Sequence, residues 1–146
     1  MIRELTVGDF MTTCVLTIGA KATLATAHQV MRENRVRHLP VFDGDRLVGI
    51  VSQRDLYLLE TIRGVDSSDT QVEDAMSADP YVVPPTALLT DVVKKMIAHR
   101  WGSAIVSDGM RVKGVFTTVD AMRALVSTLP RSGRKTTQPR GAPRAS

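Results

Sequence analysis

Hydrophobic and polar positions follow two different periods along this chain, and the same succession of periods occurs twice. Each half begins with a leading segment, at residues 6–11 in the first half and 71–76 in the second. A short extended stretch follows, at residues 15–18 and 81–83 respectively. Apolar residues at helical spacing follow, and these are Leu24, Ala27 and Met31, then Leu89, Val92, Val93 and Met96. Two short strands and a second helix, which begins at Gln53 or Thr118, complete each half. The pattern therefore predicts a β-α-β-β-α unit in each half of the chain.

The two short strands of each unit are expected to form a hairpin. They cover residues 37–43 and 46–52 in the first half, then residues 102–108 and 111–117 in the second half. An Asp-Gly dipeptide lies at the turn in both cases, Asp43-Gly44 and Asp108-Gly109. This dipeptide readily takes the left-handed backbone angles of a tight turn between antiparallel strands.

The two halves are copies of one another at a constant distance of 65 residues. The phrase GIVSQRD, Gly49–Asp55, returns as GVFTTVD, Gly114–Asp120. Other residues of the first copy recur in the second at the same distance without a gap, and these include Val7, Asp9, Met11, Ala22, Leu24, Met31, Asp43, Gly44 and Arg46. An internal repeat of this kind decides the fold, because each copy is one structural unit.

A unit of about 60 residues buries little apolar surface when it is alone. We therefore expect an α+β fold in which the two units pack sheet against sheet with pseudo-two-fold symmetry. The predicted organisation is a first repeat, a linker, a second repeat and a tail, at residues 1–62, 63–70, 71–129 and 130–146. The tail is rich in Pro, Gly, Ser, Thr and Arg, so it is expected to be disordered.

Two β-α-β-β-α units, each with the phrase G-h-h-[ST]-x-x-D before its last helix, resemble a pair of CBS domains (h is apolar, x is any residue). This is the regulatory module of the cystathionine-β-synthase type, and the resemblance covers about residues 1–129. It implies a stand-alone, non-catalytic CBS-domain pair that binds an adenosine compound between its repeats.

The phrase has two physical interpretations, and the sequence leaves both open. Ser52 with Asp55, and Thr117 with Asp120, fit a capping box, in which the hydroxyl and the carboxylate satisfy free amides at a helix start. The same helix start can accept a phosphate, and a carboxylate can accept both hydroxyls of a ribose. The CBS resemblance implies that second role, and one phrase can serve both.

The resemblance implies two related pockets that share their residues between the repeats. The phrases would supply Ser52, Arg54, Asp55, Thr117 and Asp120, and the walls that hold the base would supply Arg37, His38, Met11, Val15, Leu16, Met76, Tyr81 and Ser103. By that analogy, Asp55 would face residues 76–81 and Ser103. Asp120 would face residues 11–16 together with Arg37 and His38. Of the two pockets, the one with Asp55 is the better receiver of an anion, because Arg54 corresponds to Val119 in the second copy.

Other residues that could carry chemistry favour structural roles. His28 corresponds to Val93, which indicates packing, and His99 lies at a helix C-terminus, where a histidine suits the helix dipole. Trp101 is expected to pack at a turn. Cys14 is the single cysteine, and no base accompanies it. The spacing of the histidines and Cys14 fits no metal site, so neither a metal site nor a catalytic residue is predicted.

The net charge of +4 comes from the tail. Five of the 19 basic residues and none of the 15 acidic ones lie in residues 129–146, so the remaining chain is near neutral. The apolar content of 43 % is typical of a globular protein, and no apolar run is long enough to span a membrane. Without a signal-peptide pattern at its start, the chain is expected to be cytoplasmic.

We therefore expect a regulatory module that binds AMP, ADP, ATP or S-adenosylmethionine, without a covalent cofactor, and forms a homodimer. Its output would be a change in repeat or dimer arrangement that a separate effector protein detects. The choice of nucleotide and the presence of Mg²⁺ beside its phosphates stay open. The alternative is a protein that binds nucleic acid or a partner through the basic tail, with the repeats as a scaffold.

Overall fold

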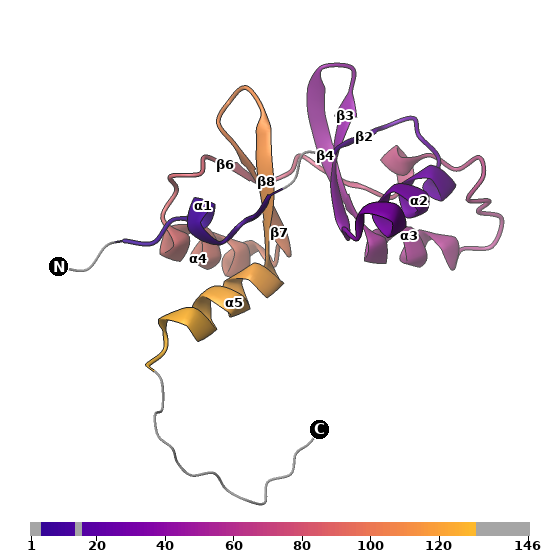
Figure 1. The fold of residues 1–146 in the computed structure, drawn as a ribbon. Coiled ribbons are helices and arrows are strands. Elements are labelled where there is room, and N and C mark those ends of the chain that lie inside the picture. The colour runs from indigo at the N-terminus through magenta and orange to yellow at the C-terminus, as the bar shows by residue number, and fades with distance from the viewer. Residues whose placement is uncertain (1–3, 14–15, 131–146) are drawn as a thin grey trace, which may run out of the picture.

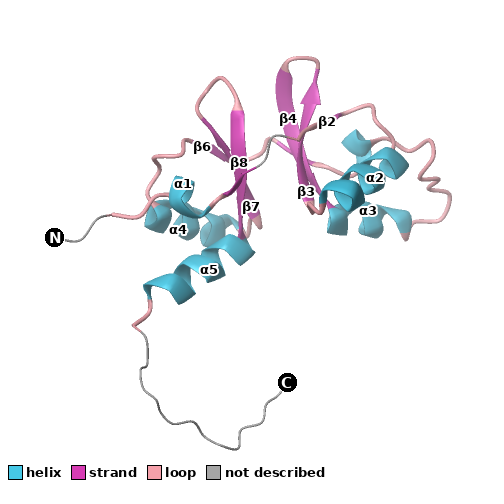
Figure 2. Cartoon of the chain, in the orientation of Figure 1, coloured by secondary structure: helices cyan, strands magenta, loops and turns pink. Residues whose placement is uncertain are grey.

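The structure, a computed structural model, describes residues 4–13 and 16–130 of the chain. Two four-stranded sheets stand at the centre, and helices flank them on both sides (Figures 1 and 2). The first copy contains α1 (Val7–Phe10), β1 (Thr12–Thr13), β2 (Ile18–Gly19), α2 (Leu24–Asn34), β3 (His38–Asp43), β4 (Arg46–Ser52) and α3 (Gln53–Glu60). The second copy contains η1 (a 3-10 helix, Val72–Asp74), β5 (Ser77–Ala78), β6 (Val82–Val83), α4 (Leu89–His99), β7 (Ser103–Ser107), β8 (Val112–Thr117) and α5 (Thr118–Thr128). The predicted α+β repeat is confirmed.

Both predicted hairpins are present, and in each turn the glycine of the Asp-Gly dipeptide has the expected left-handed backbone, whereas the aspartate does not. Strands β3 and β4 pair antiparallel, as do β7 and β8. Gly44 and Gly109 lie at the turns with φ angles of +63° and +95°, which residues with a Cβ rarely adopt. The predicted extended stretches are shorter than expected, since β2 begins at Ile18 and β6 at Val82.

Each sheet receives its edge strand from the other copy, which the sequence pattern did not predict. Strand β1 pairs antiparallel with β8 of the second copy, and β5 pairs antiparallel with β4 of the first. The leading segments cross over with these strands. The amide of Val7 donates to the carbonyl of Ala87 at 2.9 Å, and the amide of Val72 donates to that of Ala22 at 2.8 Å. In Figure 1 the indigo α1 accordingly lies beside α4 and β8.

Three groups of buried side chains hold the molecule together. One lies under the helices of each copy, and each includes a residue from the exchanged segment, Val72 in the first and Val7 in the second. The third group joins the two sheets and consists of Ile50, Ile105 and Val115, which are at most 8 % exposed. The predicted packing of sheet against sheet is therefore confirmed. The tail from residue 131 onward lies outside the described residues.

Candidate functional site

Both copies of the phrase form a capping box at the start of a helix. Ser52 Oγ accepts from the Asp55 amide at 3.0 Å, and Asp55 Oδ2 accepts from the Ser52 amide at 2.9 Å. The Thr117 hydroxyl accepts from the Asp120 amide at 3.4 Å, and Asp120 Oδ2 accepts from the Thr117 amide at 2.9 Å. The local sequence explains both helix starts, because each pair satisfies two amides that the helix leaves free.

A cavity of about 530 Å³ opens between the two copies at the first of these helix starts. The first copy lines it with Arg37, His38, Ile50, Ser52, Gln53, Arg54, Asp55 and Tyr57. The second copy contributes Ser77, Gly102, Ser103 and Thr118. The volume is in the range of small-molecule sites, which is about 300–1,000 Å³.

The cavity combines cations with an available carboxylate. Arg37 and Arg54 are exposed at it, and neither forms an ion pair among the described residues. Asp55 is partly exposed, and within residues 4–13 and 16–130 no group donates a hydrogen bond to its Oδ1 atom. Burial lowers the pKa of His38 below 6.5, and Arg37 lowers it further, although the negative charges of Asp55 and Asp120 act in the opposite direction. His38 is therefore mainly neutral at pH 7, and the positive charge of the cavity comes from the two arginines.

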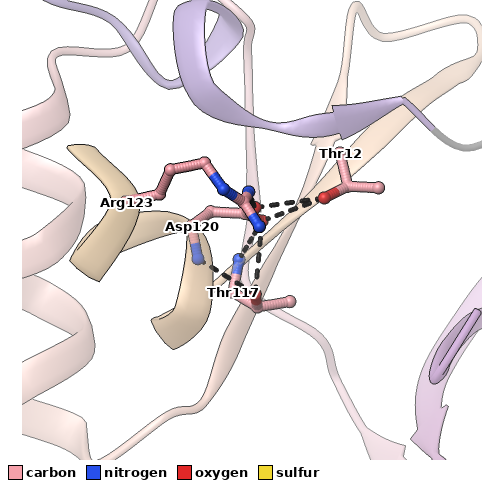
Figure 3. A network of polar contacts seen from close by, with 4 residues as sticks. All are labelled: Thr12, Thr117, Asp120 and Arg123. Carbon is pink, nitrogen blue, oxygen red and sulfur yellow. Dashed lines mark hydrogen bonds and ion pairs between the residues drawn. The ribbon is translucent and has the colours of Figure 1, made fainter. Parts of the chain in front are cut away.

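The second helix start has different surroundings (Figure 3). Asp120 is 1 % exposed, and its Oδ1 atom accepts from the Thr12 hydroxyl at 3.1 Å and from Arg123 Nη1 at 2.6 Å. Thr12 belongs to the exchanged strand β1, so this network ties β1 to α5. Neither Thr117 nor Asp120 lines the cavity between the copies.

The structure brings together some of the residues predicted for the site and separates others. Those that share the cavity are Arg37, His38, Ser52, Arg54, Asp55 and Ser103. Arg37 and His38 line this cavity together with Asp55, and the negative charge of Asp120, opposite which they were predicted to lie, also acts on His38. Each predicted facing segment contributes one residue near its aspartate. Ser77, from residues 76–81, shares the cavity with Asp55, and Thr12, from residues 11–16, donates a hydrogen bond to Asp120.

Four of the remaining predicted wall residues lie in packed positions. Met11 and Tyr81 pack against the core of the second copy, and Met76 packs against that of the first. Leu16 packs against both the first core and the group between the sheets. Val15 lies outside the described residues. These five residues stay predictions as ligand contacts.

The sequence analysis missed several residues of the two helix starts. Gln53, Tyr57 and Thr118 line the cavity, and Gln53 and Thr118 are adjacent in sequence to residues that had been predicted. Arg123 was also missed, although a basic residue three positions after an acidic one on a helix is a recognisable pairing signal.

The other candidate residues have structural contacts. His28 Nε2 lies 3.0 Å from Glu60 Oε2, and Glu60 also accepts a short hydrogen bond from the Ser67 hydroxyl. His99 stacks on Trp101 with ring centroids 4.2 Å apart. Cys14 lies outside the described residues. Among the residues that are described, no three His, Cys, Asp or Glu side chains are grouped as a metal site would require.

The sequence model of the CBS domain matches this chain twice, at residues 7–59 and 72–127. The chain belongs to the CBS-domain family. Hypoxic response protein 1 of Mycobacterium tuberculosis is 29 % identical over 121 residues, which are 82 % of this chain and 85 % of that protein. The uncharacterized protein MJ1232 of Methanocaldococcus jannaschii is 27 % identical over 130 residues, but this CBS pair spans only 42 % of its length.

Solved CBS-domain structures share the fold. The crystal structure of CBSX2 in complex with AMP superposes with a TM-score of 0.68 at 30 % identity, and the match covers 84 % of this chain and 97 % of CBSX2. None of the helices in the described part of the CBS pair has the length and hydropathy that a membrane span requires.

Proposed function

We propose that this CBS-domain pair is a non-catalytic regulatory module that binds an adenine nucleotide or a related adenosyl ligand between its repeats. The ligands considered are AMP, ADP, ATP and S-adenosylmethionine. One observation carries the proposal: the cavity places a helix start, two exposed arginines and a carboxylate with an available oxygen against residues of the other repeat. CBSX2, at 30 % identity, has been crystallised with AMP, which supports the same class of ligand.

The phosphate and the ribose of such a ligand each have a matching group in the cavity. The start of α3 offers the positive end of its dipole, and Arg37 and Arg54 offer charge-assisted donors, so a phosphate is favoured there. The Oδ1 atom of Asp55 can accept from a ribose hydroxyl while Oδ2 keeps its bond to the Ser52 amide. Capping and ligand contact are therefore compatible in the first copy.

The regulatory effect would come from contact with both repeats. Ser77, Gly102 and Ser103 reach the cavity from the second copy, so a ligand there binds one relative arrangement of the repeats better than another. A ligand shifts a conformational equilibrium only by the difference between its affinities for the two states. Mg²⁺ beside the phosphates is an open part of the proposal.

We propose a homodimer or a separate protein partner as the means of output. Helix α5 carries apolar side chains that the described residues leave exposed, and those more than half exposed are Val119, Met122, Leu125 and Val126. Apolar groups of this kind that stand together on one helix favour a protein partner.

Calorimetric titration of the four ligands into the protein tests the proposal. Saturable binding of at least one of them is expected, and Asp55→Asn is expected to weaken it at least tenfold, or about 1.4 kcal/mol. Asp9→Asn is the matched control, because Asp9 belongs to the capping box of α1 and does not line the cavity. The ligand should be recovered chemically unchanged. Absence of binding by all four ligands at millimolar concentration would refute the proposal.

A further inference from the structure

The two helix starts of this chain differ in what their aspartates contact. Asp120 has four donors from three residues around its carboxylate: the amide and hydroxyl of Thr117 on Oδ2, and Thr12 and Arg123 on Oδ1. For Asp55, the Ser52 amide is the one donor found among the described residues. The second carboxylate is therefore satisfied by the protein itself, whereas the described residues leave the first with one oxygen that has no donor.

The contacts of Asp120 occupy the positions that a ribose would need. An ionised carboxylate offers about four acceptor directions over its two oxygens. All four are used at Asp120, and the residue is 1 % exposed. A ribose hydroxyl could replace the neutral 3.1 Å bond from the Thr12 hydroxyl, but a ribose diol could bind there only after Arg123 had moved away, because the bond to Arg123 is a short, charge-assisted one of 2.6 Å.

The repeat shows that one of the three additional donors at Asp120, Arg123, is specific to the second copy by sequence. At the distance of 65 residues, Thr12 corresponds to Ser77, so both copies have a hydroxyl at that position. Arg123 corresponds to Leu58, which is 65 % exposed and cannot pair with a carboxylate. The first copy therefore has no arginine at the position from which Arg123 pairs with Asp120.

The position of the arginine near each phrase also differs between the copies, and this difference too favours a ligand in the first copy. The first copy has Arg54 beside its aspartate, where a phosphate can use it, and the second copy has Val119 at that position. The second copy instead places its arginine three residues after the aspartate, where it pairs with the carboxylate. Each copy therefore has one arginine within its phrase or on the first turns of the helix that follows, and only that of the first copy lines the cavity.

We propose that Arg123 closes the second site to nucleotide, so that each chain binds one ligand, at Asp55. This inference rests on the proposed function, since it states which of the two related positions the ligand uses. Arg123 acts here as a residue that sets the number of sites. The second helix start keeps a structural role, because its network holds the exchanged strand β1 against α5.

Reciprocal substitutions test this assignment, with AMP as the probe in calorimetric titration. Wild-type protein is expected to bind one AMP per chain. Arg123→Leu combined with Val119→Arg gives the second copy both features of the first, and it is expected to bind two. Leu58→Arg gives the first copy the pairing arginine, and it is expected to weaken AMP binding at least tenfold. Ile62→Arg is the matched control, because it adds the same charge at a 56 % exposed position just beyond α3.

The outcomes separate this inference from the proposed function. Two equivalent AMP molecules on the wild-type chain would refute the closed site and leave nucleotide binding intact. The role of Arg123 would also be refuted if wild type and the double variant both bound one AMP per chain and Leu58→Arg bound AMP as tightly as Ile62→Arg. Absence of binding by all four proteins would refute AMP binding itself. Thermal unfolding of each variant checks that a loss of binding does not come from a loss of the fold. Leu58→Arg tests the role of the pairing arginine in the first copy and leaves the contacts of Asp120 unchanged.

Discussion

Substitution of Gly114 by alanine is expected to disrupt the exchange of strand β1 between the two copies. Gly114 lies in β8 directly opposite Thr13 of β1. A Cβ atom at this position would lie closer than 3.0 Å to the carbonyl oxygen of Thr12, a separation that Cβ atoms essentially never show. The obstacle is backbone, so the clash cannot be relieved by rotation of a side chain. Either β1 must move away from β8, or β8 must distort.

The expected cost follows from two contributions. Overpacking at a site that cannot yield typically costs about 1–3 kcal/mol. The β1–β8 pairing covers two residue pairs, and each backbone hydrogen bond lost there adds about 1 kcal/mol. Movement of β1 would relieve part of the clash while losing the pairing, so the two contributions do not simply add. We expect Gly114→Ala to lower the free energy of unfolding by about 2–4 kcal/mol.

Urea denaturation followed by circular dichroism measures this change. The matched control is Gly19→Ala, also in a short strand, because an added Cβ there would meet no atom within 4 Å. The control is expected to range from no change to about 1 kcal/mol of added stability, since alanine restricts the unfolded chain. Equal unfolding midpoints for the two variants would show that β1 does not pass close to β8 in solution. Faster amide exchange in β1 would identify the strand that gave way.

Three further predictions concern the core, the linker contact and the cavity. Ile105→Ala should lower the free energy of unfolding by about 2–5 kcal/mol in urea titration, because this fully buried side chain joins the two sheets. Burial would raise the pKa of Glu60, but hydrogen bonds from Ser67 and His28 outweigh it and lower that pKa below 4.5. Glu60→Gln should therefore be less stable than wild type above about pH 5, and urea midpoints should converge as the pH falls through the folded pKa. In an NMR titration, His38 should show a pKa below 6.5, and Asp55→Asn should lower it further, because the Asp55 charge raises it.

Local sequence was sufficient to predict the parts of this fold that depend on local forces. The capping boxes need only a hydroxyl and a carboxylate three residues apart, and the hairpin turns need only Asp-Gly. The repeat then predicted the packing of the two sheets, because one unit alone buries too little surface. Each of these expectations follows from residues close in sequence or from the doubled pattern.

The exchange of the edge strands could not be predicted in the same way. Strands β1 and β5 are two residues long, so they have no detectable alternation, and their partners lie far along the chain. The exchange also explains why each phrase opens with glycine. Gly49 and Gly114 are the points where the crossing strand passes too closely for a Cβ atom. The sequence analysis had recorded these glycines as part of a repeat without a reason for them.

The first candidate site was predicted more fully than the second, and the reason lies in what surrounds each aspartate. The sequence pattern showed Asp55 and Asp120 as equivalent members of one phrase. Their difference depends on Arg123, which lies outside the phrase, and on Thr12, which is 108 residues away. Capping uses one carboxylate oxygen in both copies, so the chemistry left to each aspartate is decided by the other oxygen. In the first copy that oxygen has no donor among the described residues, whereas in the second it binds the strand exchanged between the copies. A repeated phrase can therefore support the fold in both copies and leave a carboxylate oxygen open to a ligand in only one.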